Sequence, residues 1–370
     1  PLSVEKFTPE QERFYMASQW QMMWWKFRRH RIAVISGIIL LLFYISILIS
    51  EFLAPYDLQT RHTKYIFAPT QSIHLIHDGE FVGPFVYGYK QRLNRETLKR
   101  EYEINTNKPY PLRFFCAGDE YEFWGLFKAD LHLVCPDDKK LASFFWLGTD
   151  RLGRDILSRI IYGARISLSI GLIGIAISFT LGIILGGISG YYGGWIDNVI
   201  QRTIELLKSL PQLPLWLALS AALPVTWSPI LVFFGLTVIL GLLDWPGLAR
   251  AVRSKFLSLR EDFCTAAQLM GAKPKRIIGR HLLPSFASHL IASASLAIPS
   301  MILGETALSF LGLGLRPPIT SWGVLLNETT NINAVATTPW LIYPVLPVII
   351  VVLAFNFLGD GLRDAADPYK

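Results

Sequence analysis

The sequence predicts an all-α polytopic protein that crosses a membrane with six transmembrane helices and carries one large extramembrane insertion. Hydrophobic residues make up 52% of the 370 residues and charged residues only 17%, whereas a soluble domain usually carries about 25% charged residues. The charged residues are clustered, so long apolar stretches contain none. Lys and Arg residues, which give the net charge of +7, flank these stretches. This placement favours orientation in a lipid bilayer over binding to nucleic acid.

Residues 1–31 are predicted to form an amphipathic segment on the cytoplasmic side. Between residues 19 and 31, aromatic side chains suited to the headgroup layer are mixed with basic ones that hold this end inside. Residues 32–50 then run for 19 residues without a charge, which is long enough to cross about 30 Å of hydrocarbon. Because a cleavable signal has a shorter apolar core, we expect residues 32–53 to hold an uncleaved first span.

Residues 54–145 differ in kind and form the predicted insertion. Up to residue 140 they contain 12 Lys or Arg residues, 12 Asp or Glu residues and no spanning run. Long loops cross a membrane largely regardless of charge, so this segment can lie outside as a small, partly ordered domain. There, Cys116 and Cys135 could form a disulfide or remain two buried thiols. His74 and His77 have H-x-x-H spacing but no evident further ligand, so no metal site is predicted.

The core, residues 146–370, begins with a segment rich in arginine. Residues 147–165 are interpreted as a turn and then an amphipathic helix that lies along the membrane surface. Thr149 or Asp150 is the expected helix cap. The four arginines of this segment would lie on the outer side, against the usual bias of basic residues toward the cytoplasm.

The second to fourth spans follow. Residues 166–189 form the second, in which Gly182 and Gly186 provide a small-x-x-x-small face for close helix packing. A tight turn is expected at residues 190–194. Residues 209–243 are uncharged but interrupted by prolines, which favours two spans joined by a short outer turn near residues 224–229.

Residues 282–304 and 337–358 are the fifth and sixth predicted spans. The glycines and prolines of the segment between them, residues 305–327, break any continuous helix. Irregular backbone at membrane depth is tolerated only where protein or a water-filled cavity covers it. We therefore expect a re-entrant or mouth-lining element here. Its candidate mouth or gate residues are Glu305, Phe310, Gly312, Gly314 and Trp322.

Residues 250–284 form a basic loop with eight Lys or Arg residues and two acidic ones, which places it in the cytoplasm. Ser258 and Glu261 have the spacing of a capping box, and Gly271 is a helix stop. The helix expected between this capping box and Gly271 would present one face to a partner in a helix-in-groove contact. The alternative is an ordinary polar tether. The candidate contact residues are Phe263, Thr265, Ala266, Ala267, Met270, Gly271 and Pro284.

Residues 266–284, AAQLMGAKPKRIIGRHLLP, resemble the EAA motif of bacterial ABC importer permeases. Thr265 stands where that motif usually has glutamate. Three further segments are similar to the dipeptide and oligopeptide branch of these permeases: LGTDRLGRD at 147–155, ETALSFLGLGLRPPITSWG at 305–323 and GDGLRDAADP at 359–368. The resemblance covers residues 20–53 and 146–370. The insertion is longer than that branch usually carries.

The resemblance implies the type I ABC importer permease fold in a bacterial inner membrane, with both termini cytoplasmic and the insertion periplasmic. It implies a transport subunit, not an enzyme, that forms half of a pore for peptides with a second homologous permease. Two cytoplasmic ATPases would hold the EAA loops and carry ATP and Mg²⁺, and a periplasmic binding protein would deliver the solute. The chain itself contains no G-x-x-x-x-G-K phosphate loop, so no cofactor is expected on it.

Two alternatives stay open. The same machinery could carry oligosaccharides, opines or another small solute. A different class, an ion-coupled secondary transporter, would need charged residues in the middle of its spans. The sequence offers little beyond Asp244, His289 and Glu305, which lie near span ends or alone.

Overall fold

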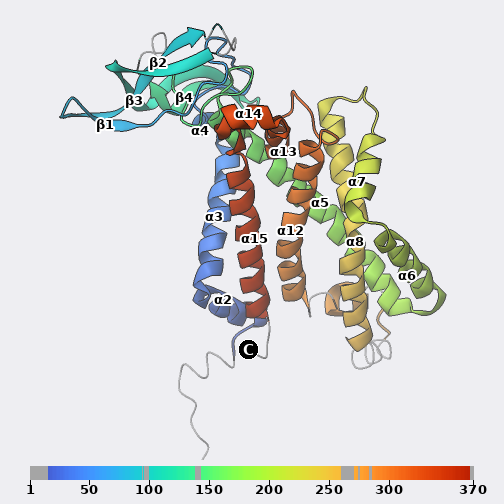
Figure 1. Cartoon of the computed structure of the whole chain (residues 1–370). Coiled ribbons are helices and arrows are strands. Elements are labelled where there is room, and N and C mark those ends of the chain that lie inside the picture. Colours follow the sequence, from blue (N-terminus) through green and yellow to red (C-terminus); the bar gives the residue numbers. More distant parts are fainter. Residues whose placement is uncertain are drawn as a thin grey trace, which may run out of the picture.

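The computed structural model describes residues 16–93, 95, 100–137, 143–259, 271–273, 276–282 and 286–366. These residues form a bundle of long helices with a β-sheet at one end (Figure 1). The helices and strands are α2 Gln19–Arg29, α3 Arg31–Leu48, α4 Ser50–Leu53, β1 His74–His77, β2 Glu80–Leu93, β3 Arg100–Phe123, β4 Phe127–Pro136, α5 Ile156–Tyr192, α6 Gly194–Ser209, α7 Gln212–Ala221, α8 Pro229–Leu259, η2 Ile277–Leu282, α12 Ala287–Phe310, α13 Trp322–Asn327, η3 Glu328–Thr330, α14 Ile332–Thr337, η4 Pro339–Ile342 and α15 Val345–Ala366.

Five segments of the described chain are long and apolar enough to cross a membrane: Arg31–Leu48, Ile156–Tyr192, Pro229–Ser258, Ala287–Phe310 and Pro339–Ala366. The third of the six predicted spans corresponds to α7, which has only ten residues. At 1.5 Å per residue it is about 15 Å long, half of the hydrocarbon thickness. The predicted six-span bundle therefore consists of five full-length helices and one short apolar helix.

The helix α5 corrects three predictions. It runs without a break for 37 residues from Ile156 to Tyr192, so the segment predicted to lie along the membrane surface is the first part of the second span. Its cap is Asp155, whose side chain accepts from the Ser158 amide. The predicted turn begins later, because Gly190 is still helical and the chain reverses at Gly193 and Gly194, both with positive φ.

A line of glycines on α5 lets α8 approach closely. A Cβ added at Gly186 would lie 2.5 Å from the Ala249 carbonyl oxygen, and one at Gly190 would lie 2.7 Å from the Phe256 Cβ. Gly182 meets α8 in the same way, at Leu248. The predicted small-residue face of the second span thus packs against α8.

The insertion is a β-sheet, so the all-α prediction is wrong for this part of the chain. Its four strands form an antiparallel meander in the order β1-β2-β3-β4. Asp78 and Gly79 form the first hairpin turn with φ of 49° and 87°, conformations that the Asp-Gly pair adopts readily. The many Tyr, Phe and Val residues of the segment favour strands over helices.

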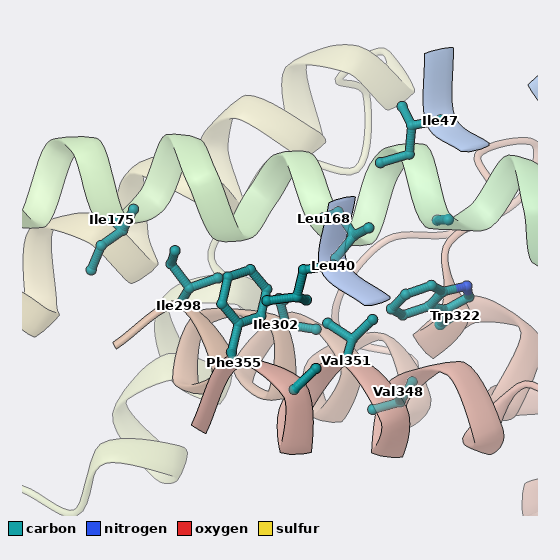
Figure 2. Close-up of a cluster of buried hydrophobic side chains, with 12 residues drawn as sticks. Leu40, Ile47, Leu168, Ile175, Ile298, Ile302, Trp322, Val348, Val351 and Phe355 are labelled. Atoms are coloured by element: carbon teal, nitrogen blue, oxygen red, sulfur yellow. The ribbon is translucent and has the colours of Figure 1, made fainter. Parts of the chain in front are cut away.

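The two ends of the bundle carry different elements. The sheet, α13 and α14 lie at one end, whereas α2, the end of α15 and the end of α8 lie at the other (Figure 1). Between them, α3, α5, α12 and α15 share a buried apolar cluster, part of which is drawn in Figure 2. Leu168, Ile302 and Val351 are fully buried within it. The end of α8, with which the segment predicted to dock a partner begins, therefore lies at the same end as both described termini.

Candidate functional site

The predicted mouth element is held by one buried acidic side chain at the end of α12. Glu305 is fully buried, and its carboxyl oxygens accept hydrogen bonds from Ser309 Oγ at 2.8 Å, Ser321 Oγ at 2.7 Å and Ser167 Oγ at 3.2 Å. Ser167 belongs to α5, whereas Ser309 and Ser321 lie at the two ends of the irregular segment. We call these four residues the Glu305 cluster.

Each serine of the Glu305 cluster also accepts a backbone N–H. Ser309 Oγ accepts from the Leu315 amide at 2.9 Å, Ser167 Oγ from the Trp322 amide at 3.1 Å, and Ser321 Oγ from the Val324 amide at 3.2 Å. A single carboxyl group thus orients three hydroxyls that hold the Leu315 amide of the irregular segment and two amides in the first turn of α13. This satisfies polar groups that would otherwise be costly to bury.

The other predicted mouth residues shape this element. Gly312 has φ of 78°, and a Cβ at Gly314 would lie 2.5 Å from the Ser309 amide, so the chain turns here only because both are glycine. Trp322 is fully buried and donates from its indole to the Ile160 carbonyl at 3.1 Å. The Phe310 carbonyl accepts from Asn327 Nδ2 at 2.7 Å. In this chain Glu305 and Trp322 face the protein interior and support the mouth element from within.

The arginine-rich segment at the start of α5 is a charged junction at the same end. Asp150 is buried, and its Oδ2 lies 2.7 Å from Arg154 Nε and 2.5 Å from Arg159 Nη1. Arg159 also reaches Glu328 Oε1, at 3.3 Å. Because Glu328 follows α13, this network ties the start of α5 to the mouth element.

A second ion pair gives another of the four arginines, Arg165, an acidic partner. Arg165 Nη2 lies 2.9 Å from Glu51 Oε2 and donates to the Ile47 carbonyl at 3.2 Å. The Trp124 ring covers the guanidinium, with Cζ 3.9 Å from the ring centroid. Acidic partners therefore neutralise the basic charge that the sequence alone would assign to the cytoplasmic side.

At the opposite end, α6 is clamped to α8. Arg253 donates from Nε to Asp197 Oδ1 at 2.6 Å and from Nη2 to Asp197 Oδ2 at 2.5 Å, and Ser189 Oγ of α5 also donates to Asp197. The Arg253 hydrogen bonds lower the pKa of Asp197 below its usual value. Asp197 thereby links α5, α6 and α8.

The predicted capping box is wrong, because Ser258 lies inside α8 and its hydroxyl donates to the Lys255 carbonyl. Gly271 has φ of 79°, as expected at a helix stop. A hydrophobic cluster joins Phe256 of α8 to Ile277 and Phe286 beyond Gly271. Several predicted contact residues lie outside the described residues: Phe263, Thr265, Ala266, Ala267, Met270 and Pro284.

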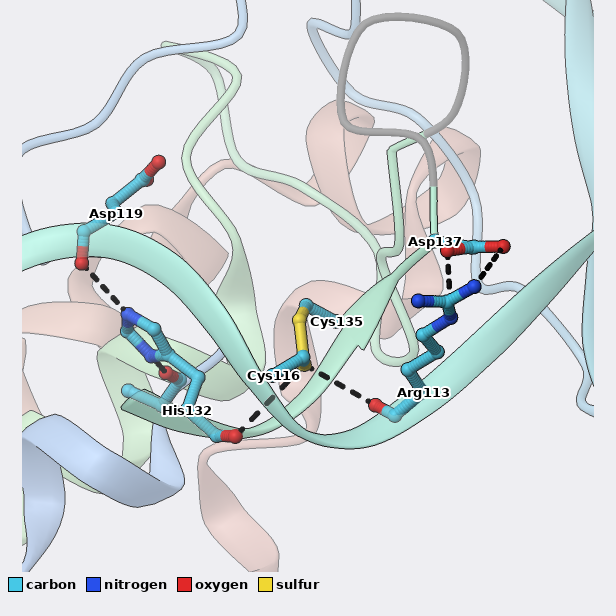
Figure 3. Close-up of a disulfide and its surroundings, with 7 residues drawn as sticks. Arg113, Cys116, Asp119, His132, Cys135 and Asp137 are labelled. Atoms are coloured by element: carbon cyan, nitrogen blue, oxygen red, sulfur yellow. Dashed lines mark hydrogen bonds and ion pairs between the residues drawn. A yellow bond between two sulfur atoms is a disulfide. The ribbon is translucent and has the colours of Figure 1, made fainter. Parts of the chain in front are cut away.

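In the sheet, Cys116 and Cys135 are joined as a disulfide between β3 and β4 (Figure 3). The structure thus decides between the two alternatives that the sequence left open. His77 hydrogen-bonds to the Tyr87 hydroxyl at 3.0 Å and pairs with Asp78. Within the described residues, no group of three metal-ligating side chains occurs.

These features define a class of protein: a multi-span helical membrane protein with a supported irregular element at one end of its bundle and a basic connecting segment at the other. The chain belongs to the family of binding-protein-dependent transport system inner membrane components, whose sequence profile matches residues 178–369. A profile of the N-terminal transmembrane domain of oligopeptide transport permease C matches residues 18–69.

Curated relatives agree with this membership. The chain is 40% identical over 226 residues to the dipeptide transport system permease protein DppC of Bacillus subtilis (strain 168), covering 60% of this chain and 68% of the relative. It is 40% identical over 230 residues to the oligopeptide transport system permease protein OppC of Haemophilus influenzae, covering 62% and 71%. The glutathione transport system permease protein GsiD of Pectobacterium atrosepticum is 40% identical over 228 residues, covering 61% and 73%.

Among solved structures, a chain of the inward-facing MetNI methionine ABC transporter matches with a TM-score of 0.45 and 19% identity, covering 57% of this chain and 97% of that one. The relatives are named as permease components of transport systems. The prediction of a transport subunit rather than an enzyme is confirmed.

Proposed function

We propose that this permease forms half of a pore that imports peptides, and that α12 transmits the movement that opens it. α12 begins at Ala287, directly after the basic connecting segment, and ends at Phe310, five residues after Glu305. One helix therefore links the segment that would dock a partner to the element that would close the mouth. Helices move as rigid elements when packed side chains shift together.

The partners proposed for this pore are a second homologous permease, two ATPases that bind ATP and Mg²⁺ and hold residues 250–284, and a periplasmic binding protein. In this arrangement both termini are cytoplasmic and the insertion is periplasmic, in a bacterial inner membrane. The placement of α2, rich in Trp and basic residues, at the end opposite the sheet supports this orientation. The clamp between Asp197 and Arg253 supports α12 as a lever that transmits this movement, because it holds α8 to α6 at the start of the docking segment.

The lever is tested at Gly271. An alanine at φ of 79° would be strained by roughly 1–2 kcal/mol, so Gly271→Ala should shift the segment that follows. Gly279→Ala is the matched control, because it lies in η2 and a Cβ there meets nothing within 4 Å. In reconstituted vesicles, Gly271→Ala should lower uptake of a radiolabelled dipeptide per ATP hydrolysed, and Gly279→Ala should not. Normal coupled uptake by Gly271→Ala would refute the lever.

The substrate class is tested with the same vesicles. Peptides are proposed because relatives are named for dipeptides, oligopeptides and glutathione. Panels of peptides, oligosaccharides and opines would rank the solutes, and preference for a non-peptide would replace the proposal. Uptake driven by an ion gradient without ATP would instead support an ion-coupled secondary transporter.

The sheet is proposed to help receive the binding protein. A cleft of about 640 Å³ lies between the base of the insertion and the mouth, lined by Ile66, Tyr102, Asn331, Thr337 and Trp340 among others. Residues 62–68 must be kept in any deletion, because the His62 and Ala68 amides bond to Gly153 and Thr149. Gln71 and Phe145 are hydrogen-bonded to each other, so residues 73–142 can be replaced by a short linker. The binding protein should dock more weakly to this variant, and unchanged affinity would leave the sheet as a spacer.

A further inference from the structure

We infer that the tip of the β3–β4 hairpin inserts into the outer surface of the lipid bilayer and anchors the sheet there. The tip, residues 123–127, reads Phe-Trp-Gly-Leu-Phe and carries no charge. Leu126 is 80% exposed, Phe127 58% and Trp124 45%. Hairpin turns in water are usually made of Gly, Asn, Asp, Ser and Pro. A turn of bulky apolar side chains left open to solvent calls for an apolar partner.

The backbone of the tip is strained in a way that places Trp124. The turn closes with a hydrogen bond from the Leu126 amide to the Phe123 carbonyl, and its central residues Trp124 and Gly125 have φ of 50° and 70°. Glycine adopts this conformation freely, but a tryptophan does so only where its surroundings compensate. Here the Trp124 indole donates to the Leu48 carbonyl at 2.9 Å and stacks on Arg165.

These contacts fix the depth of the tip. Leu48 is the last residue of α3, a span of 18 residues that is about 27 Å long at 1.5 Å per residue. A hydrocarbon layer is about 30 Å thick, so the end of α3 lies at its border. Trp124 therefore lies at the headgroup level, where tryptophan is enriched in membrane proteins. The adjoining Leu126 and Phe127 lie at a level that lipid occupies.

We infer that lipid covers the tip because the tip adjoins the exposed apolar side of α3. The outward side of α3 is apolar and exposed, with Leu41, Leu42 and Leu48 each between 58% and 59% exposed. Such a side faces lipid in a span that packs on α15 with its other side. The tip adjoins the end of this surface through Trp124, and the two charges beside it, Arg165 and Glu51, neutralise each other as an ion pair under the indole ring. Glu122 and Lys128, which pair across the two strands just behind it, mark where polar surface begins.

The experiment places a small fluorophore on single cysteines in the full chain, reconstituted with its copurifying subunits in phosphatidylcholine vesicles. The background carries Cys264→Ser, and Cys116 and Cys135 stay paired. Leu126→Cys and Phe127→Cys are the test sites. Ile332→Cys is the matched control, because Ile332 is 81% exposed at the same end of the bundle but lies on α14.

We expect quenching by nitroxides attached to the lipid chains near the headgroup to be severalfold stronger at 126 and 127 than at 332. Quenching by aqueous iodide should be severalfold weaker at both test sites than at 332. Iodide quenching at 126 and 127 equal to that at 332 would overturn the inference in favour of a water-exposed tip. Protection from both quenchers would also overturn it, since a protein subunit would then cover the tip. Two test sites keep the result decisive if one variant fails to fold.

Discussion

Replacement of Glu305 by alanine should release the mouth element while leaving the bundle folded. The variant removes the acceptor of the three hydroxyls of Ser167, Ser309 and Ser321. Each buried hydroxyl that loses its partner costs roughly 1 kcal/mol, so the three together cost about 3 kcal/mol. Because every 1.4 kcal/mol changes an equilibrium tenfold, local opening of residues 311–324 should increase on the order of a hundredfold.

Hydrogen exchange read by mass spectrometry measures this opening. The amides of Leu315, Trp322 and Val324 should exchange faster in Glu305→Ala, since the serines that hold them lose their orientation. Peptides from α15 should keep their protection. Thr306→Ala is the matched control: Thr306 is the next residue, is equally part of α12, and its buried hydroxyl has no hydrogen-bond partner in the described structure. Equal exchange in both variants would refute the role of the Glu305 cluster.

Two further predictions concern packing and pH. Gly186→Ala should destabilise the protein by roughly 1–3 kcal/mol in detergent, because the added Cβ would lie 2.5 Å from the Ala249 carbonyl oxygen. Gly187→Ala is the control and should be tolerated, because its Cβ would meet Phe256 at 3.6 Å. Equal melting temperatures of the two variants would contradict this prediction. Burial raises the pKa of Asp155 to about 7. The folded chain therefore binds this proton more tightly than the unfolded chain, and stability present below about pH 4 is lost as pH rises through 7. Asp155→Asn keeps a helix cap and should flatten this loss between pH 5 and 8, as measured by thermal unfolding; an unchanged pH dependence would contradict it.

The sequence predicted which segments span the membrane more accurately than it predicted the residues at which the spans begin and end. Uncharged runs of about 20 residues identify spans because lipid excludes charge, and this holds for α3, α12 and α15. The length of α5 was missed, since its first turns carry Arg159 and Arg165, which composition alone assigns to the membrane surface. Their acidic partners Asp150 and Glu51 come from residues nine and 114 positions away, and such pairing is invisible in a local window.

The insertion and the mouth element show two further limits. The Asp-Gly pair at 78–79 between apolar runs was a usable hairpin signal, so the sheet could have been predicted. The role of Glu305 could not, because its partners come from α5, its own helix and the far end of the irregular segment. A lone acid near a span end is equally compatible with a pore-lining group, a proton carrier or a buried support.

The arginines around the start of α5 illustrate how the structure changes an argument from charge. Counted by type, Arg151, Arg154, Arg159 and Arg165 speak against placing this end of the bundle outside the cytoplasm. All four, however, have acidic partners within 4 Å, and these partners, Asp150, Glu51 and Glu328, are largely buried. The orienting bias arises from basic groups that stay free to interact with the membrane, whereas a neutralised pair contributes little net charge. At the opposite end, Arg28 and Arg29 of α2 are exposed to the surroundings. The charge distribution therefore supports the proposed orientation, in which the sheet lies outside.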